Sequence, residues 1–183
     1  MCLQVSDEPV TCGLCGAITS SVPEGSPLHA YVPAPAACWA MFGAVQADEA
    51  ERFGYPLPAH RLVVDAYMAS HPGPGIDRRD RQSVFVHLRA LAARRALGWE
   101  EGHVLELMRG GSGVRVDYPI LTPPSAVARM NVSDMRGSTD VADYTDRASR
   151  WADAVWESWA HEHDRVLATL EGAHVRRSTG RVS

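Results

Sequence analysis

The chain has 183 residues, of which 45% are hydrophobic, and a formal net charge of −4, which is enough for one domain with a buried core. All 18 basic residues are arginines, so the chain has no lysine for a Schiff base or for a Walker A phosphate loop. The sequence shows neither a signal peptide nor an apolar run long enough to span a bilayer, so we expect a cytoplasmic protein without membrane partners.

The N-terminal region is organised around Cys12 and Cys15, which are separated by a glycine and a leucine. This spacing is typical of a zinc knuckle that supplies half of a tetrahedral site, although CxxC motifs also serve redox chemistry. Residues 16–37 are rich in proline, glycine and serine and have no sustained periodicity, which predicts an irregular segment. We therefore expect residues 1–37 to form a zinc-knuckle arm in which Cys2 takes no part.

Four stretches in the middle of the chain carry apolar residues at helical spacing, and glycine or proline follows each of them. The expected helices cover residues 39–52, 59–70, 77–97 and 100–108. The second is apolar on almost all sides, which predicts that it is buried. Alternating apolar residues at 114–118 indicate at most one short strand or extended segment.

The last third of the chain carries one long apolar stripe. Its members are Tyr144, Ala148, Trp151, Val155, Trp159, Val166 and Leu170. This stripe predicts a single helix of roughly thirty residues that ends at Gly172, with its tryptophans in the core. His161 and His163 alternate with the acidic Glu162 and Asp164 and are expected on the solvated face of that helix.

Together these patterns predict a mainly α, single-domain protein over residues 1–183, with little or no sheet. A helical bundle is expected over residues 38–172, preceded by the arm and followed by a frayed basic tail at 173–183.

The remaining ligands of the knuckle follow from how the first two helices pair. A short connection makes neighbouring helices antiparallel, and helices of similar length, each about 20 Å, then share both ends. Cys38 and His71 should therefore lie at one end of the pair, with His60 at the other. The predicted zinc ligands are Cys12, Cys15, Cys38 and His71. His29, on the arm, is the main alternative for the fourth place.

A second group of polar residues, Asp65, Ser83 and His87, lies on apolar helical segments. Ser83 and His87 are one helical turn apart and share a face, and a buried Asp65 on the neighbouring helix could orient the imidazole ring for acid–base catalysis. A purely structural interpretation is also open, because Arg61 lies one turn before Asp65 and can pair with it.

Several motifs are similar to those of the bacterial DUF5946 family. They are Cys12-x-x-Cys15-Gly16-Ala17, Cys38-Trp39-Ala40, His60-Arg61-Leu62-x-Val64-Asp65-Ala66-Tyr67, His71-Pro72-Gly73, Gln82-Ser83-Val84-x-Val86-His87-Leu88, and Trp151-Ala152-x-x-Val155-Trp156-x-x-Trp159. The resemblance covers residues 12 to about 170 and implies no function, since none is assigned to the family. It does imply that the cysteines can bind zinc. It also implies that the polar residues Asp65, Gln82, Ser83 and His87 are part of the family's sequence pattern. Ser70 departs from the pattern, in which we expect glutamine.

Two functions therefore remain. In the first, zinc is structural and the protein is an accessory or binding module for an unknown small molecule or protein. In the second, the protein is an enzyme that acts on a small molecule by acid–base or metal-assisted hydrolytic chemistry near Asp65, Ser83 and His87. Nucleic-acid binding is not favoured, because the arginine runs are short, the net charge is negative and no aromatic residues interleave with the arginines.

Overall fold

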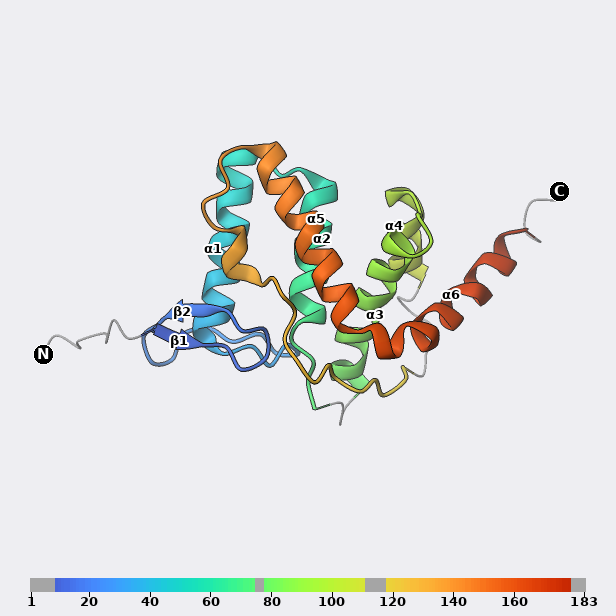
Figure 1. Ribbon diagram of the computed structural model, residues 1–183, viewed down its shortest axis with the longest axis horizontal. Helices are drawn as coiled ribbons and strands as arrows, with labels where there is room; N and C mark the ends of the chain where they lie inside the picture. Colours follow the sequence, from blue (N-terminus) through green and yellow to red (C-terminus); the bar gives the residue numbers. More distant parts are fainter. Residues whose placement is uncertain (1–8, 75–77, 111–117, 179–183) are drawn as a thin grey trace, which may run out of the picture.

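The computed structural model describes residues 9–74, 78–110 and 118–178 of the chain. It confirms the prediction of a mainly α protein, and the sheet within the described ranges is one two-stranded hairpin (Figure 1). The elements are β1 (Pro9–Thr11), β2 (Ile18–Ser20), α1 (Ala36–Phe53), α2 (Leu57–Ala69), α3 (Arg78–Arg95), α4 (Glu101–Gly110), the 3-10 turn η1 (Val132–Met135), α5 (Val141–Ser158), the 3-10 turn η2 (Ala160–Glu162) and α6 (His163–Ser178).

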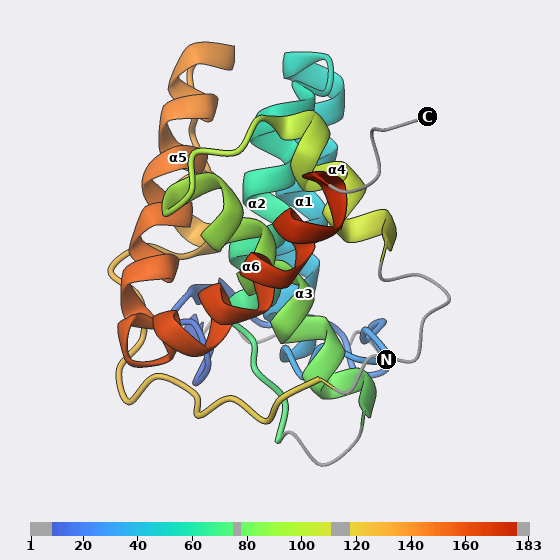
Figure 2. The same ribbon diagram turned by 90° about the vertical axis from the view of Figure 1, so that its right-hand side faces the viewer.

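Helix α2 is at the centre of the bundle. It packs against α5 on one side and α3 on another, while α6 crosses α3 farther out (Figures 1 and 2). Its buried residues, which include Val63, Asp65 and Tyr67, point in several directions around the helix. This position explains why the sequence of α2 is apolar on almost all sides.

The connection between α1 and α2 is short because Gly54 ends α1 sharply. Gly54 adopts the left-handed conformation, with φ 66°, and its N–H donates to the carbonyl of Glu49. Pro58 then stands in the first turn of α2, where its missing N–H costs nothing. The two helices consequently run back along each other, and the predicted ends of both helices are shifted by only a few residues from those in the structure.

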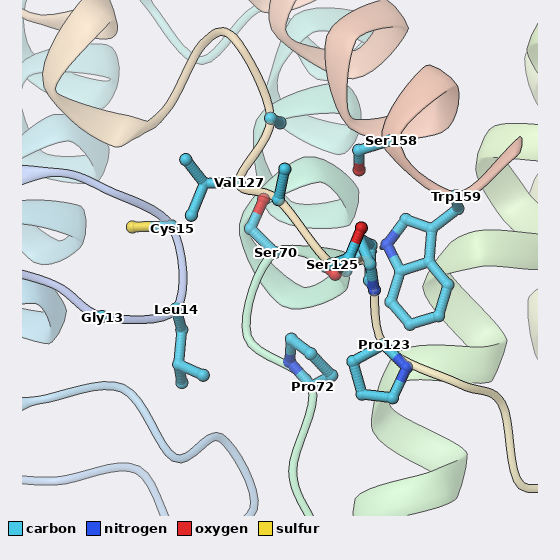
Figure 3. Close-up of a pocket in the computed structure, with 14 residues that line it drawn as sticks. Gly13, Leu14, Cys15, Ser70, Pro72, Pro123, Ser125, Val127, Ser158 and Trp159 are labelled. Carbon is cyan, nitrogen blue, oxygen red and sulfur yellow. Dashed lines mark hydrogen bonds between the residues drawn. The ribbon is translucent and has the colours of Figure 1, made fainter.

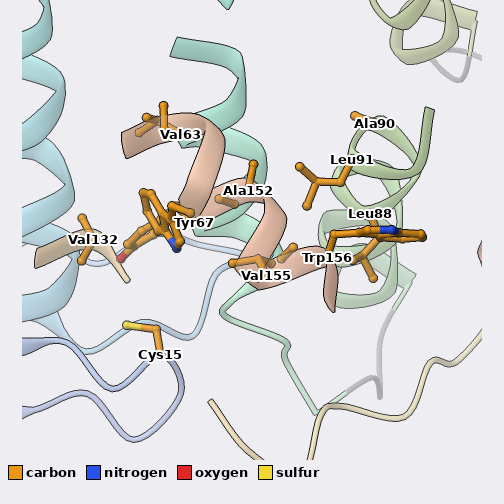
Figure 4. Packing of buried hydrophobic residues seen from close by; sticks show 14 of the residues in the cluster. Cys15, Val63, Tyr67, Leu88, Ala90, Leu91, Val132, Ala152, Val155 and Trp156 are labelled. Carbon is orange, nitrogen blue, oxygen red and sulfur yellow. The ribbon is translucent and has the colours of Figure 1, made fainter. Parts of the chain in front are cut away.

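Helix α5 supplies the largest part of the tryptophan core. Its buried stripe includes Tyr144, Trp151 and Val155, and the flanking Trp156 lies beside Leu88 of α3 (Figure 4). The helix begins at Asp140, whose side chain accepts hydrogen bonds from the N–H groups of Ala142 and Asp143, both at 2.9 Å. These bonds satisfy two of the free amide groups at the helix start.

The predicted long C-terminal helix is interrupted in the structure. Helix α5 ends at Ser158, and η2 separates it from α6. At the break, the Trp159 indole N–H donates to the carbonyl of Ala69 at 3.2 Å, and Glu162 accepts the N–H of Thr122 at 2.8 Å. The bend lets α5 cover α2 while α6 covers α3, which one straight helix cannot do.

Other differences concern the ends of the chain. Helix α6 continues past Gly172 to Ser178, and the β1–β2 hairpin was not expected from the sequence. The extended segment expected at 114–118 lies outside the described residues except for Tyr118, which is buried. Within the described ranges, no helix combines the length and the apolar character needed to cross a membrane.

The cap of α5 gives a test of this architecture. We expect Asp140→Ala to lower the free energy of unfolding by about 1 kcal/mol, because two amide groups at the helix start lose their acceptor. Urea denaturation measures this change. Asp146→Ala, which removes an exposed ion pair with Arg150 on the same helix, is the control and should leave the midpoint unchanged. Equal midpoints for the two variants would contradict the role given to the cap.

Candidate metal centre

Cys12 and Cys15 are held in the turn of the β1–β2 hairpin. The strands pair antiparallel, and the turn is closed by hydrogen bonds from Cys12 N–H to the Ala17 carbonyl and from Gly16 N–H to the Cys12 carbonyl, both at 2.8 Å. These bonds fold the backbone around the two sulfur atoms, so that both thiols are buried although the hairpin itself is largely exposed.

Gly16 is required by the shape of this turn. Its φ is +77°, a conformation that L side chains rarely adopt. A Cβ atom at this position would also stand 3.2 Å from Cγ2 of Val127, which lies on the extended segment that passes over the knuckle. Gly13, in the same turn, has open space around its Cα and no positive φ.

The first turn of α1 and the end of α2 bring the other two side chains to the same place. Cys38 and His71 join Cys12 and Cys15 in a group whose four possible ligand atoms all lie within 4.8 Å of one another. Each of the four residues is at most 2% exposed. The structure thus brings together the four residues predicted as ligands, from three separate segments of the chain.

The distances within the group suit a tetrahedral ion. A metal–sulfur distance of about 2.3 Å and a metal–nitrogen distance of about 2.0 Å imply S···S and S···N separations of about 3.8 and 3.5 Å. The observed separations are 3.7 Å for Cys15 Sγ–Cys38 Sγ, 3.6 Å for Cys12 Sγ–His71 Nε2 and 3.3 Å for Cys38 Sγ–His71 Nε2. These three of the six separations are close to tetrahedral values, and all six are within 4.8 Å, so the four residues could hold a metal ion.

Tyr67 orients the histidine and one of the thiols. His71 Nδ1 lies 2.7 Å from the Tyr67 carbonyl oxygen, which can accept a hydrogen bond only from a protonated nitrogen. The other ring nitrogen, Nε2, faces the sulfur atoms and is left to bind a metal. The Tyr67 hydroxyl donates to Cys38 Sγ at 3.6 Å, and its ring stacks on Phe42. Such outer contacts are typical of metal ligands, because they fix the ring and support the charge of a thiolate.

The electrostatics of the group favour a cation. Hydrogen bonds from Cys15 and Cys38 lower the pKa of Cys12, whereas the hydrogen bond with Cys12 raises the pKa of Cys15. Burial opposes a charged His71, but hydrogen bonds with Cys12 and Cys38 prevail and raise its pKa to about 9. Without a metal the thiols cannot all ionise together, and a divalent cation would remove this repulsion.

The other histidines considered as ligands lie elsewhere. The His29 ring packs against Trp39, and its Nδ1 accepts the N–H of Tyr31 at 3.1 Å. His60 lies at the opposite end of the α1–α2 pair, with Nδ1 3.0 Å from Oε2 of the buried Glu49. Neither histidine belongs to the four-residue group found within the described residues.

Asp65 and His87 meet between α2 and α3. Asp65 is 1% exposed, and its Oδ1 lies 2.6 Å from His87 Nδ1. The basic partner of Asp65 is Arg94 rather than Arg61: Arg94 donates to Oδ2 at 2.5 Å. Ser83 is half-buried and hydrogen-bonds to neither Asp65 nor His87 within the described part of the chain.

Two polar contacts in the structure are not evident from the sequence pattern. Arg94 also donates two hydrogen bonds to Glu101, both at 2.8 Å, which anchors α4 to α3. Glu49 accepts from the Tyr144 hydroxyl at 3.1 Å, and burial together with this carboxylate raises the pKa of Tyr144. Glu49 follows Phe42 and Val45 on one helical face, so a charged residue in that apolar stripe was the available signal.

Comparison with known protein families supports the resemblance seen in the motifs. The model described as "Family of unknown function (DUF5946)" matches residues 10–160. The chain belongs to this family. The DUF5946 match includes the group of Cys12, Cys15, Cys38 and His71 as well as Asp65 and His87. Comparisons with curated proteins and with solved structures found no match.

The requirement for glycine in the knuckle can be tested directly. Gly16→Ala should lower the stability of the protein by about 1–3 kcal/mol, because alanine is strained at positive φ and its Cβ approaches Val127. Gly13→Ala is the matched control in the same turn and should have almost no effect. Chemical denaturation of the two variants gives the comparison, and equal loss in both would show that the turn is not as described.

Proposed function

We propose that the protein binds one Zn²⁺ through Cys12, Cys15, Cys38 and His71, and that this ion is structural. The observation that carries the proposal is the convergence of four buried ligand atoms within 4.8 Å. Three sulfurs and one imidazole nitrogen in a tetrahedral arrangement suit zinc, whereas magnesium and calcium prefer oxygen ligands. Buried, unpaired thiols also suit the reducing cytoplasm, where we place the protein.

A structural role is favoured because the protein supplies all four ligands. Catalytic zinc sites keep one position for water or substrate, whereas closed four-ligand sites stabilise folds. The arm needs such support, since its hairpin has only three residues in each strand and β1 is exposed throughout. An ion at the site would fasten the hairpin to α1 and to the end of α2.

A structural ion leaves the function of the domain to its surface and pockets. We infer that the protein is an accessory or binding module, whose partner is a small molecule or another protein. The zinc site would then hold the knuckle in place as part of the surface that the partner meets.

The metal proposal predicts about one zinc ion per purified chain. Cys12→Ala should remove most of this zinc and lower the thermal midpoint, because metal binding contributes to folding. Cys2→Ala is the control, since Cys2 has no place in the proposed site. Elemental analysis and thermal denaturation of both variants are the measurements. Full zinc content in Cys12→Ala would refute the assignment.

The contact between Asp65 and His87 favours a second candidate, an enzyme of acid–base chemistry. Asp65 accepts from Nδ1 of His87, which leaves Nε2 as the atom able to take a proton. Nε2 makes no hydrogen bond to another described residue, and the His87 side chain is 17% exposed. Arg94 holds the other oxygen of Asp65 and so fixes the pair. Ser83, one turn before His87 on α3, would offer the nearest hydroxyl along that helix.

This candidate predicts the tautomer of His87. Nitrogen chemical shifts should show a proton on Nδ1, because Asp65 accepts from that atom. The exposed His103 serves as the unconstrained reference. His87→Gln should keep the full metal content, since His87 takes no part in the cysteine–histidine group. A ring protonated at Nε2 alone would exclude His87 as the base.

A further inference from the structure

A cavity of about 160 Å³ lies between the knuckle and the break that follows α5. One wall is formed by the knuckle, another by the end of α2, a third by residues 123–128 and the last by Ser158 and Trp159 (Figure 3). The sulfur of Cys15 points away from the serines of the cavity, toward the metal-binding group. The cavity is therefore a separate space that shares only a wall with the proposed zinc site.

The walls carry no charge. None of the residues that line the cavity is acidic, basic or histidine, and the apolar part of the surface includes Leu14, Pro72, Pro123 and the ring of Trp159. An ion in such a space would lose its hydration without gaining a partner. The chemistry of the walls thus selects an uncharged occupant.

Two of the three serine hydroxyls in the walls already use their protons within the protein. Ser70 already donates its hydroxyl proton to the Ala66 carbonyl at 2.8 Å, and Ser158 donates to the Val155 carbonyl at 2.7 Å. The Trp159 indole N–H is likewise used by the Ala69 carbonyl. Both serine oxygens can therefore accept a hydrogen bond, whereas Trp159 contributes only its apolar ring.

The size of the cavity limits the occupant to a small ring or a branched chain. A cavity of about 150 Å³ in another protein is known to hold benzene. We propose that this cavity binds a small uncharged molecule with an apolar body near the size of a benzene ring and one hydroxyl or N–H donor. The donor meets the oxygens of Ser70 and Ser158, and the apolar body lies against Trp159 and the prolines.

Phenol and toluene test this proposal because they have nearly the same size and shape. Phenol carries a hydroxyl group where toluene carries a methyl group. Binding to the purified full chain is followed by titration of the Trp159 indole signal and the backbone amide signals of residues 125–128 in nitrogen–proton NMR spectra. Phenol should bind about threefold or more tightly than toluene, since it alone can donate to the serines. Benzoate, the charged counterpart, should not shift these signals.

Substitutions at residues 122 and 125 test whether phenol binds in the cavity. Ser125→Leu should abolish the shifts by filling the cavity, whereas Thr122→Leu, on the same exposed segment but outside the cavity, should preserve them. Ser158→Ala should weaken phenol and leave toluene unchanged, which tests the acceptor without filling space. Toluene binding as tightly as phenol, equal binding of benzoate, unaltered phenol binding in Ser125→Leu, or no shift with phenol would each overturn the proposal.

Discussion

The structure depends on the meeting of three thiols and one imidazole in a space that excludes water. These groups come from the hairpin, from the start of α1 and from the end of α2, and they are almost fully buried. Polar groups in such a place must be paired, and thiols packed together cannot all carry their charge unless a cation balances them. A metal ion bound there, as we propose, would resolve this conflict and would join the three segments.

Helix α2 connects this site with the rest of the molecule. Tyr67 supports two of the four proposed ligands, one through its carbonyl and one through its hydroxyl. Half a turn earlier, Asp65 faces α3 and holds His87 and Arg94. Ala69 and Ser70, at the end of the same helix, form part of the cavity wall. Because these features lie on one buried helix, a change in how α2 packs would affect all of them.

Local patterns in the sequence were sufficient to predict most of the helices. They also predicted that the three cysteine side chains and the histidine side chain lie close together. The pairing of α1 with α2 followed from a short connection and similar lengths, so Cys38 and His71 could be placed together without a structure. The hairpin was not predicted, because its strands are short and their pairing depends on the turn. The break after α5 was missed because the apolar stripe keeps its phase through η2, so Trp159 and Val166 remain on one face.

Other features could not be read from local patterns, because they depend on contacts between distant segments. Asp65 had a possible partner one turn away in Arg61, but the packing of α3 on α2 brings Arg94 to it instead. The cavity likewise requires residues 123–128, which have no helical or strand periodicity, to pass beside the knuckle.

The most direct test of the central claim is X-ray absorption spectroscopy at the zinc edge of the purified protein. We expect three sulfur atoms at about 2.3 Å and one nitrogen atom at about 2.0 Å from the zinc ion, with no water among its ligands. Absence of zinc, or a shell dominated by oxygen, would contradict it.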